Sequence, residues 1–99
     1  MDRKELAAAV RESVRAFARM VPGHSVELRV PPFVAVQCVE GPRHTRGTPP
    51  NIVEMDAATW LALADGSLTW ADAVADGRVS ASGPRSDLSE HLPLHPADS

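Results

Sequence analysis

The sequence predicts a single mixed α/β domain, in which a small mixed sheet of about four to five strands is covered by helices. Three observations support this class: a long amphipathic segment, a series of short apolar segments, and two short capped helical segments. The expected order of elements is α-β-β-β-α-α-β-α. With 99 residues, 43% of them hydrophobic, the chain is expected to fold as one domain over residues 1–94 with a frayed tail at 95–99.

Residues 3–20 are predicted to form the first helix. Asp2 suits the N-cap position, and Pro22-Gly23 ends the helix. Apolar side chains recur three or four residues apart on one face: Leu6, Val10, Val14, Phe17 and Val21. The other surface is rich in arginine, so the helix could lie on a membrane, but its interspersed acidic residues favour packing on a sheet.

Three strands are expected next. Residues 25–30 alternate between apolar and polar, which predicts a strand with one buried face. Residues 33–40 are apolar on both faces and are predicted to form a central strand covered on both sides, paired with the first strand as a hairpin across Pro31-Pro32. Residues 41–50 hold three prolines and two glycines and predict a loop before a short strand at 51–55.

Two short helices and a fourth strand follow. Asp56 is expected to cap the first of these helices and Gly66 to end it. Thr69 is expected to cap the second, with Asp72 in a capping-box-like position. Residues 78–82 predict a strand with Val79 and Ala81 on one face. A last short helix is expected to start at Ser86 or Asp87 and to carry Leu88 and Leu92.

The charge balance excludes several classes of partner. The net charge is −3, so no affinity of the whole chain for nucleic acid is expected. The charge is uneven: residues 1–50 carry 8 basic and 5 acidic side chains, and residues 51–99 carry 2 basic and 8 acidic ones.

No apolar run approaches the roughly 20 residues of a transmembrane helix, and no signal peptide is evident. A single cysteine excludes an internal disulfide. We therefore expect a cytoplasmic protein without integral membrane contact.

Residues 51–92 carry a more specific pattern. A strand runs into an acidic cap, a helix ends in Leu-x-x-Gly, a second helix ends in Gly, and a short strand before a glycine leads to a closing helix; the landmarks are Asp56, Leu63, Gly66, Ala73, Gly77, Val79 and Gly83. This pattern resembles the core of the sterol carrier protein-2 (SCP-2) family, and residues 40–56 look like its small bacterial branch, with an actinobacterial-type composition. The resemblance implies an SCP-2-like fold and a carrier of hydrophobic molecules.

The same resemblance leaves the state of the pocket open. Family tunnels are closed partly by C-terminal elements, and little chain follows Leu94 here. The pocket is therefore expected to be smaller, open to solvent, or filled by side chains. Related domains also occur as accessory or dimerisation parts of bacterial acetyltransferases and thiol-dependent isomerases, which implies a second kind of role.

Seven apolar residues are candidates for a ligand pocket between helices and sheet. Trp60 and Trp70 are the sharper candidates, because an indole N–H needs a polar partner and so tends to lie at a pocket rim. The alternative is that the same residues simply form the core, since a chain with four aromatic residues has few to spare for lining a cavity. The seven residues are Phe33, Trp60, Leu63, Trp70, Val74, Leu88 and Leu92.

The proline-rich loop offers a candidate site for an anionic head group. Arg43, His44 and Arg46 stand close together there, and arginine suits bidentate contact with carboxylate or phosphate. The alternatives are a solvated loop or arginines paired with the acidic second half. Because a phosphate-loop signature is absent, the motif is not specific.

No catalytic residue, metal site or cofactor is expected. Cys38 is interpreted as a reduced core residue, and His91 and His95, four residues apart, are separated by Pro93, which disfavours a helical metal pair. The prediction is a non-catalytic carrier of a lipid or acyl-type small molecule. The alternative is a protein-interaction module, such as a homodimer, with a filled core and no ligand.

Overall fold

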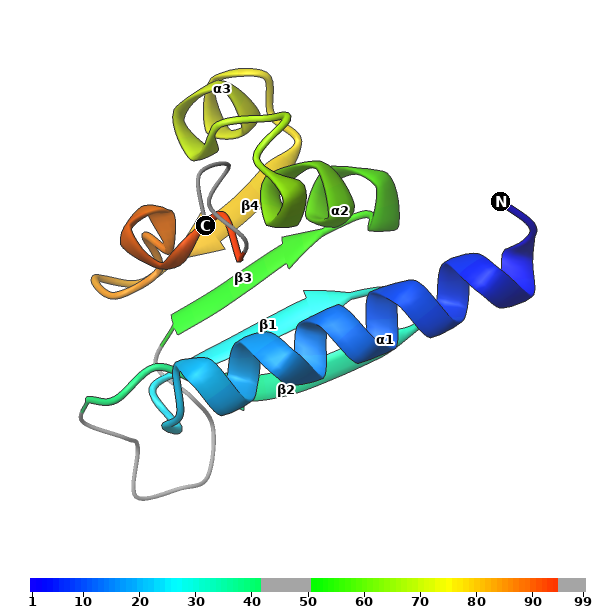
Figure 1. Ribbon diagram of the computed structural model, residues 1–99. Helices are drawn as coiled ribbons and strands as arrows, with labels where there is room; N and C mark the ends of the chain where they lie inside the picture. Colours follow the sequence, from blue (N-terminus) through cyan, green and yellow to red (C-terminus); the bar gives the residue numbers. More distant parts are fainter. Residues whose placement is uncertain (42–50, 95–99) are drawn as a thin grey trace.

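Four strands form one mixed sheet in the order β2-β1-β3-β4 (Figure 1). The computed structural model describes residues 1–41 and 51–94. Its elements follow the predicted order, which confirms the mixed α/β class. They are α1 (Arg3–Met20), β1 (Val26–Val30), β2 (Val34–Cys38), β3 (Asn51–Met55), α2 (Ala57–Asp65), α3 (Trp70–Ala75), β4 (Val79–Ser82) and a 3-10 turn, η1 (Ser89–His91).

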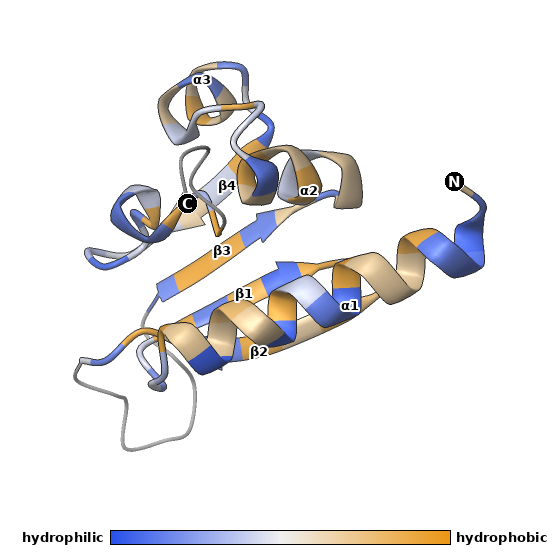
Figure 2. Cartoon of the chain, in the orientation of Figure 1, coloured by the Kyte–Doolittle hydropathy of each residue, from blue (hydrophilic) through white to orange (hydrophobic). Residues whose placement is uncertain are grey.

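The sheet has one buried and one wetter face. Leu28 of β1 lies opposite Val36 of antiparallel β2 and Val53 of parallel β3, and these side chains turn to the inner face with the core. On the outer face Arg29 forms ion pairs with Glu27 and with Glu54, the latter at 3.9 Å between Nη1 and Oε1. Apolar and polar residues accordingly interleave along α1 and the central strands (Figure 2).

Helix α1 begins and packs as its pattern predicts. The Asp2 carboxylate accepts the backbone N–H of Glu5 at 2.8 Å, and the Glu5 side chain returns to the N–H of Asp2, so the helix starts with a capping box. Val10, Val14 and Phe17 are fully buried. The helix runs along the sheet in front of β1 and β2 (Figure 1) and contacts β2, so its apolar face packs on the sheet as predicted.

The central position predicted for residues 33–40 is wrong. The hairpin with β1 is present, and the N–H of Phe33 closes its turn on the carbonyl of Val30 at 3.0 Å. Strand β2, however, lies at the edge of the sheet, with Ala35 and Gln37 exposed. Only its inner face is covered, because α1 packs on that face alone; the outer face carries a small side chain and an amide.

The C-terminal segment departs from the prediction as well. Instead of a helix from Ser86 or Asp87, there is a single 3-10 turn beginning at Ser89. The side chain of Asp87 accepts the N–H of Ser89 at 2.9 Å, and the backbone of Leu92 is extended, as the following Pro93 requires. In β4, Val79 is buried but Ala81 is exposed, so the strand buries less than its alternation predicts.

A buried amide ties the elements together at one end of the sheet. Asn51 Nδ2 donates to the Ser25 carbonyl at 2.7 Å, and Asn51 Oδ1 accepts the N–H of Arg85 at 2.8 Å. Asn51 is 1% exposed, so both bonds replace lost hydration. The amide therefore fixes the start of β3 to Ser25, the residue before β1, and anchors the segment that leads to η1.

Candidate functional site

A groove with a volume of about 340 Å³ lies between α2, α3 and the segment that contains η1. Its volume falls within the range of small-molecule sites, and apolar side chains dominate its lining. The hydroxyls of Thr69 and Ser89 and the indole of Trp70 are the polar side-chain groups among the lining residues. That lining consists of Leu63, Gly66, Leu68, Thr69, Trp70, Ala71, Ser89, Leu92 and Pro93.

Local signals in the sequence build this groove. Gly66 ends α2 in the left-handed region (φ 86°), a conformation that favours glycine and turns the chain sharply toward α3. The Thr69 hydroxyl then accepts the N–H of Asp72 at 3.1 Å and starts α3, so that Trp70 is the first residue of the helix. The short link between the two helices therefore sets Trp70 beside Leu63 at the groove.

The third wall comes from the end of the described chain. The N–H of Leu94 donates to the Ala64 carbonyl at 2.9 Å, which holds the segment against the last turn of α2. A Cβ at Gly66 would lie 3.5 Å from the ring of Pro93, so α2 and this segment already pack closely there. The groove is thus an opening between three short segments rather than a hole through the core.

Three of the seven predicted pocket residues line the groove: Leu63, Trp70 and Leu92. Leu63 is 1% exposed, while Trp70 and Leu92 are half-buried. Val74 lies on α3 but is 45% exposed and is not part of the lining. The sharper candidate at the rim is therefore Trp70.

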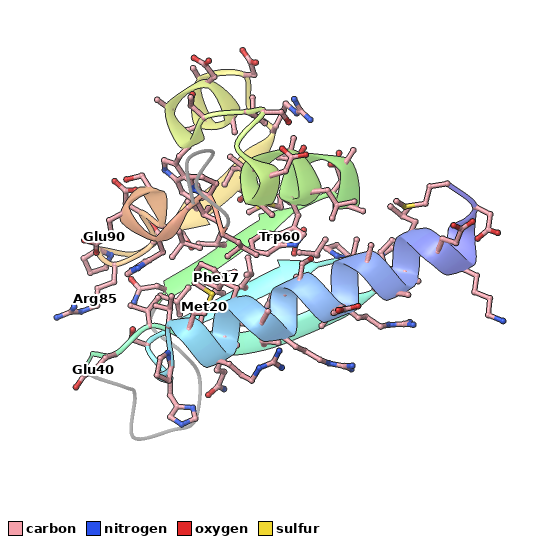
Figure 3. All side chains as sticks on the ribbon, in the orientation of Figure 1. Phe17, Met20, Glu40, Trp60, Arg85 and Glu90 are labelled. Carbon is pink, nitrogen blue, oxygen red and sulfur yellow. The ribbon has the colours of Figure 1, made fainter. Side chains whose placement is uncertain are left out.

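Trp60, Leu88 and Phe33 lie elsewhere. Trp60 is fully buried; its indole N–H donates to the Ser13 hydroxyl at 2.8 Å, and its ring meets Phe17 edge-on, with 5.6 Å between centroids (Figure 3). Leu88 is also fully buried. Trp60 and Leu88 are therefore core residues.

Phe33 is at the β1–β2 turn. It is half-buried against α1, where the Arg3 guanidinium lies 5.4 Å from its ring centroid and the Arg11 Nε donates to its carbonyl at 3.1 Å. Phe33 borders a separate, shallow hollow with Pro31 and Arg29.

The candidate anion site lies outside the described residues. Arg43, His44 and Arg46 fall within 42–50, so their contribution stays a prediction. His95 falls in 95–99 and is likewise outside the described residues. His91 is described: its ring meets Phe17 edge-on, with 6.2 Å between centroids, and its Nε2 lies 3.4 Å from the Glu90 carboxylate.

Sequence reasoning missed Leu68 and Pro93 as groove residues. Leu68 stands directly before the Thr69 cap, the position from which an apolar residue packs back on the helix it precedes, and that signal could have found it. From the sequence alone, Pro93 is interpreted only as a residue that disfavours a helix. Its proximity to Gly66 depends on a contact between segments 27 residues apart, which no local pattern indicates.

Asp65 and Asp87, two ionisable groups near the groove, each accept a hydrogen bond from a backbone N–H two residues further on. Hydrogen bonds from Ser67 lower the pKa of Asp65, and hydrogen bonds from Ser89 lower the pKa of Asp87.

Cys38 is fully buried, and desolvation raises the pKa of its thiol to about 11. At neutral pH the thiol is protonated and shielded from solvent, the opposite of a reactive cysteine, as predicted for a core residue.

We compared the chain with curated proteins and with models of protein families. No curated protein matches it. In residues 1–41 and 51–94, every helix is too short or too polar to cross a lipid bilayer. A family model described as bacterial SCP ortholog matches residues 2–94, from the cap of α1 to the third wall of the groove. The chain therefore belongs to the bacterial SCP ortholog family, a sterol carrier protein-like family.

Proposed function

We propose that this protein is a non-catalytic carrier that binds a hydrophobic small molecule, of lipid or acyl type, in the groove between α2, α3 and residues 89–93. The observation that carries the proposal is the groove itself: an apolar opening of about 340 Å³ flanked by a half-buried tryptophan. Membership of a sterol carrier protein-like family supports the same class of ligand.

The energetics suit an apolar chain. Leu68, Trp70 and Leu92 offer partly exposed apolar surface that a ligand would cover. Each ligand methylene that leaves water contributes about 0.8 kcal/mol. Six of them would contribute about 5 kcal/mol before the cost of association and of ordering the ligand, so the affinity should rise with the length of the apolar chain.

The lining supports binding rather than catalysis. None of the described residues that line the groove has an ionisable side chain, and the Thr69 hydroxyl is engaged as the cap of α3. Acid–base or nucleophilic chemistry needs a titratable or activated group at the reacting atoms. A non-catalytic carrier function is therefore our proposal for this chain, and the cytoplasmic location expected from the sequence remains a proposal as well.

Native mass spectrometry of the freshly purified protein, followed by solvent extraction, tests the proposal directly. We expect an adduct that extracts as an apolar molecule, and refilling of the emptied protein by a twelve-carbon amphiphile. Trp70→Ala should weaken this uptake about tenfold, because the indole forms one side of the groove. Val74→Ala removes an exposed residue from the same helix and should leave uptake unchanged. Equal uptake by the wild-type protein and Trp70→Ala would contradict this site.

A second function is favoured by two observations. The core is filled by Trp60 and Phe17, and among the described residues strand β2 lies at an edge of the sheet, which also suits an interaction module or a homodimer. Under that function the purified protein carries no adduct and its mass in solution is that of a dimer or complex. The same native mass spectrum therefore separates the two functions.

A further inference from the structure

The groove of the proposed carrier is apolar inside, but acidic residues border the two helices that form it. Asp65, the last residue of α2, adjoins the lining residue Gly66, and its side chain accepts the N–H of Ser67 at 2.8 Å. Asp72 lies in the first turn of α3, next to the lining residue Ala71. Both carboxylates are exposed, so each helix brings a negative charge near the groove.

The third wall is acidic too. Asp87 binds the backbone N–H of the lining residue Ser89 through its carboxylate, and Glu90 directly follows Ser89. Glu90 is 79% exposed, and Figure 3 shows it on the outside of this segment. The lowered pKa values of Asp65 and Asp87 keep these two groups ionised well below neutral pH. All three segments of the groove thus contribute negative charge.

The arginines of the same half point to other parts of the molecule. Among the described residues 57–94, Arg78 and Arg85 are the two that carry a permanent positive charge. Arg78 Nε donates to the Thr59 hydroxyl at 3.1 Å, in the first turn of α2, and the Arg85 side chain lies against Gly41. Figure 3 shows oxygen-tipped side chains on α3, and both nitrogen-tipped and oxygen-tipped ones along α1. Among the described residues, the charges that adjoin the groove along the chain are therefore mainly negative.

We propose that the groove selects an amphiphile with a cationic, ammonium-type head, whose apolar chain lies in the groove while its charge stays at the acidic rim. Trp70 supports this choice, because a half-buried indole attracts cations through its ring as well as apolar chains. The inference rests on the proposed function: it names the ligand class for the same groove.

The expected preference is moderate and depends on salt. Exposed carboxylates act on a head group through solvent, and salt screens charges that lie further apart than about 8 Å at physiological ionic strength. An ammonium amphiphile should therefore bind about tenfold more tightly than its neutral counterpart at low salt, and only about threefold more tightly at about 0.15 M salt. The anionic counterpart should be the weakest of the three.

Isothermal titration of the wild-type protein with dodecylamine, dodecanol and dodecanoate tests this order, with the two charged probes kept below their micelle concentrations and dodecanol below its solubility limit. The three probes share one chain and differ in the charge of the head. Titration of Trp60→Phe by fluorescence, where Trp70 is the remaining tryptophan, shows that the probes enter the groove. We expect dodecylamine to bind most tightly and to lose most affinity as salt is raised.

Charge-neutral variants locate the effect. Asp72→Asn and Asp87→Asn should each lower the affinity for dodecylamine about twofold and leave that for dodecanol unchanged; Asn at 87 retains the oxygen that accepts the Ser89 N–H. Asp76→Asn makes the same change at the opposite end of α3 and should have a smaller effect than Asp72→Asn.

The possible outcomes separate the two proposals. If dodecanoate binds as tightly as dodecylamine or more tightly, or if dodecanol matches dodecylamine at low salt, the cationic head is ruled out and the carrier function stands. If none of the three probes binds or alters Trp70 fluorescence, the carrier function itself is contradicted.

Discussion

Trp60 and Trp70 belong to neighbouring helices, yet they occupy two different environments. Trp60 is fully buried on α2, edge-on to Phe17, and its indole N–H reaches the Ser13 hydroxyl of α1 at 2.8 Å. Trp70 is half-buried at the start of α3 and borders the groove. One tryptophan joins two helices in a filled core, and the other flanks an opening.

The difference shows that the N–H group of a tryptophan does not by itself mark the residue as part of a binding site. An indole N–H needs a partner, and at Trp60 the neighbouring helix supplies it inside the core. Ser13 can do so because its own hydroxyl donates back to the Ala9 carbonyl at 2.7 Å. Trp70 follows a glycine turn and a cap, and its side chain at the start of α3 is half-buried.

The largest effect should separate the two tryptophans in stability. Trp60→Ala should lower the free energy of unfolding by about 4 kcal/mol, because it leaves a large cavity beside Phe17. Trp70→Ala should cost about 1 kcal/mol, since its side chain is already partly in water. Urea denaturation followed by circular dichroism measures both. Equal losses would abolish the distinction between core and groove.

A second contrast compares Gly23, which follows α1, with Gly66, which ends α2 beside the groove. At Gly23 the φ is +149°, and a Cβ there would lie 2.1 Å from the Val39 carbonyl oxygen. Gly23→Ala should therefore lower the free energy of unfolding by about 3 kcal/mol. At Gly66 the nearest atom is 3.5 Å away, and Gly66→Ala should cost about 1 kcal/mol for the left-handed conformation alone. Thermal unfolding of the two variants checks this, and a larger loss at Gly66 would contradict it.

The Ser13–Trp60 hydrogen bond gives a third, smaller effect. Ser13→Ala leaves the buried indole N–H without its partner and should cost about 2 kcal/mol. The same change in a Trp60→Phe background should cost clearly less, because no N–H is then left unpaired. A double-mutant cycle from urea midpoints measures this coupling. Strictly additive effects would show that the bond does not stabilise the core.

The smallest effect concerns α2, which connects the two regions. The Asp56 carboxylate accepts the Thr59 N–H at 2.8 Å, and hydrogen bonds from Thr59 lower the pKa of this carboxyl below its ordinary value of 3.8. Asp56→Ala should cost about 1 kcal/mol at neutral pH. Since the folded pKa is depressed, this stabilisation is present above pH 3.8 and is lost as the pH falls through the lower folded value.

Urea unfolding of the wild-type protein and Asp56→Ala at several pH values measures the effect of the cap. The gap between the two should shrink in acid. Asp56→Asn retains an acceptor oxygen that does not titrate, and it should lose less at neutral pH. A gap that stays constant down to pH 3 would rule out the carboxylate as the origin of the effect.

Local elements followed the sequence where short-range physics sets them. The spacing of Val10, Val14 and Phe17 predicted α1, and the caps Asp56 and Thr69 began α2 and α3 as expected. Hydrogen bonds within one turn and the period of the apolar residues suffice for such predictions.

The edge position of β2 did not follow from its composition. Ala35 is apolar but small, so the outward face of the strand can remain in water at little cost. The final helix also failed, because its length was decided by the Asp87–Ser89 turn and by Pro93. The first error came from reading apolar residues as a sign of burial, and the second from a turn and a proline that stop the helix.

By itself the sequence determined the mixed fold class, the order of the elements and the family resemblance, because these depend on periodicity, caps and turn residues. Only the tertiary structure decided which tryptophan is core and which borders the groove, and that Gly66, Pro93 and Leu68 complete that groove. The physical reason is that burial depends on contacts between segments far apart in the chain, such as Ser13 with Trp60. Local patterns carry no information about such partners.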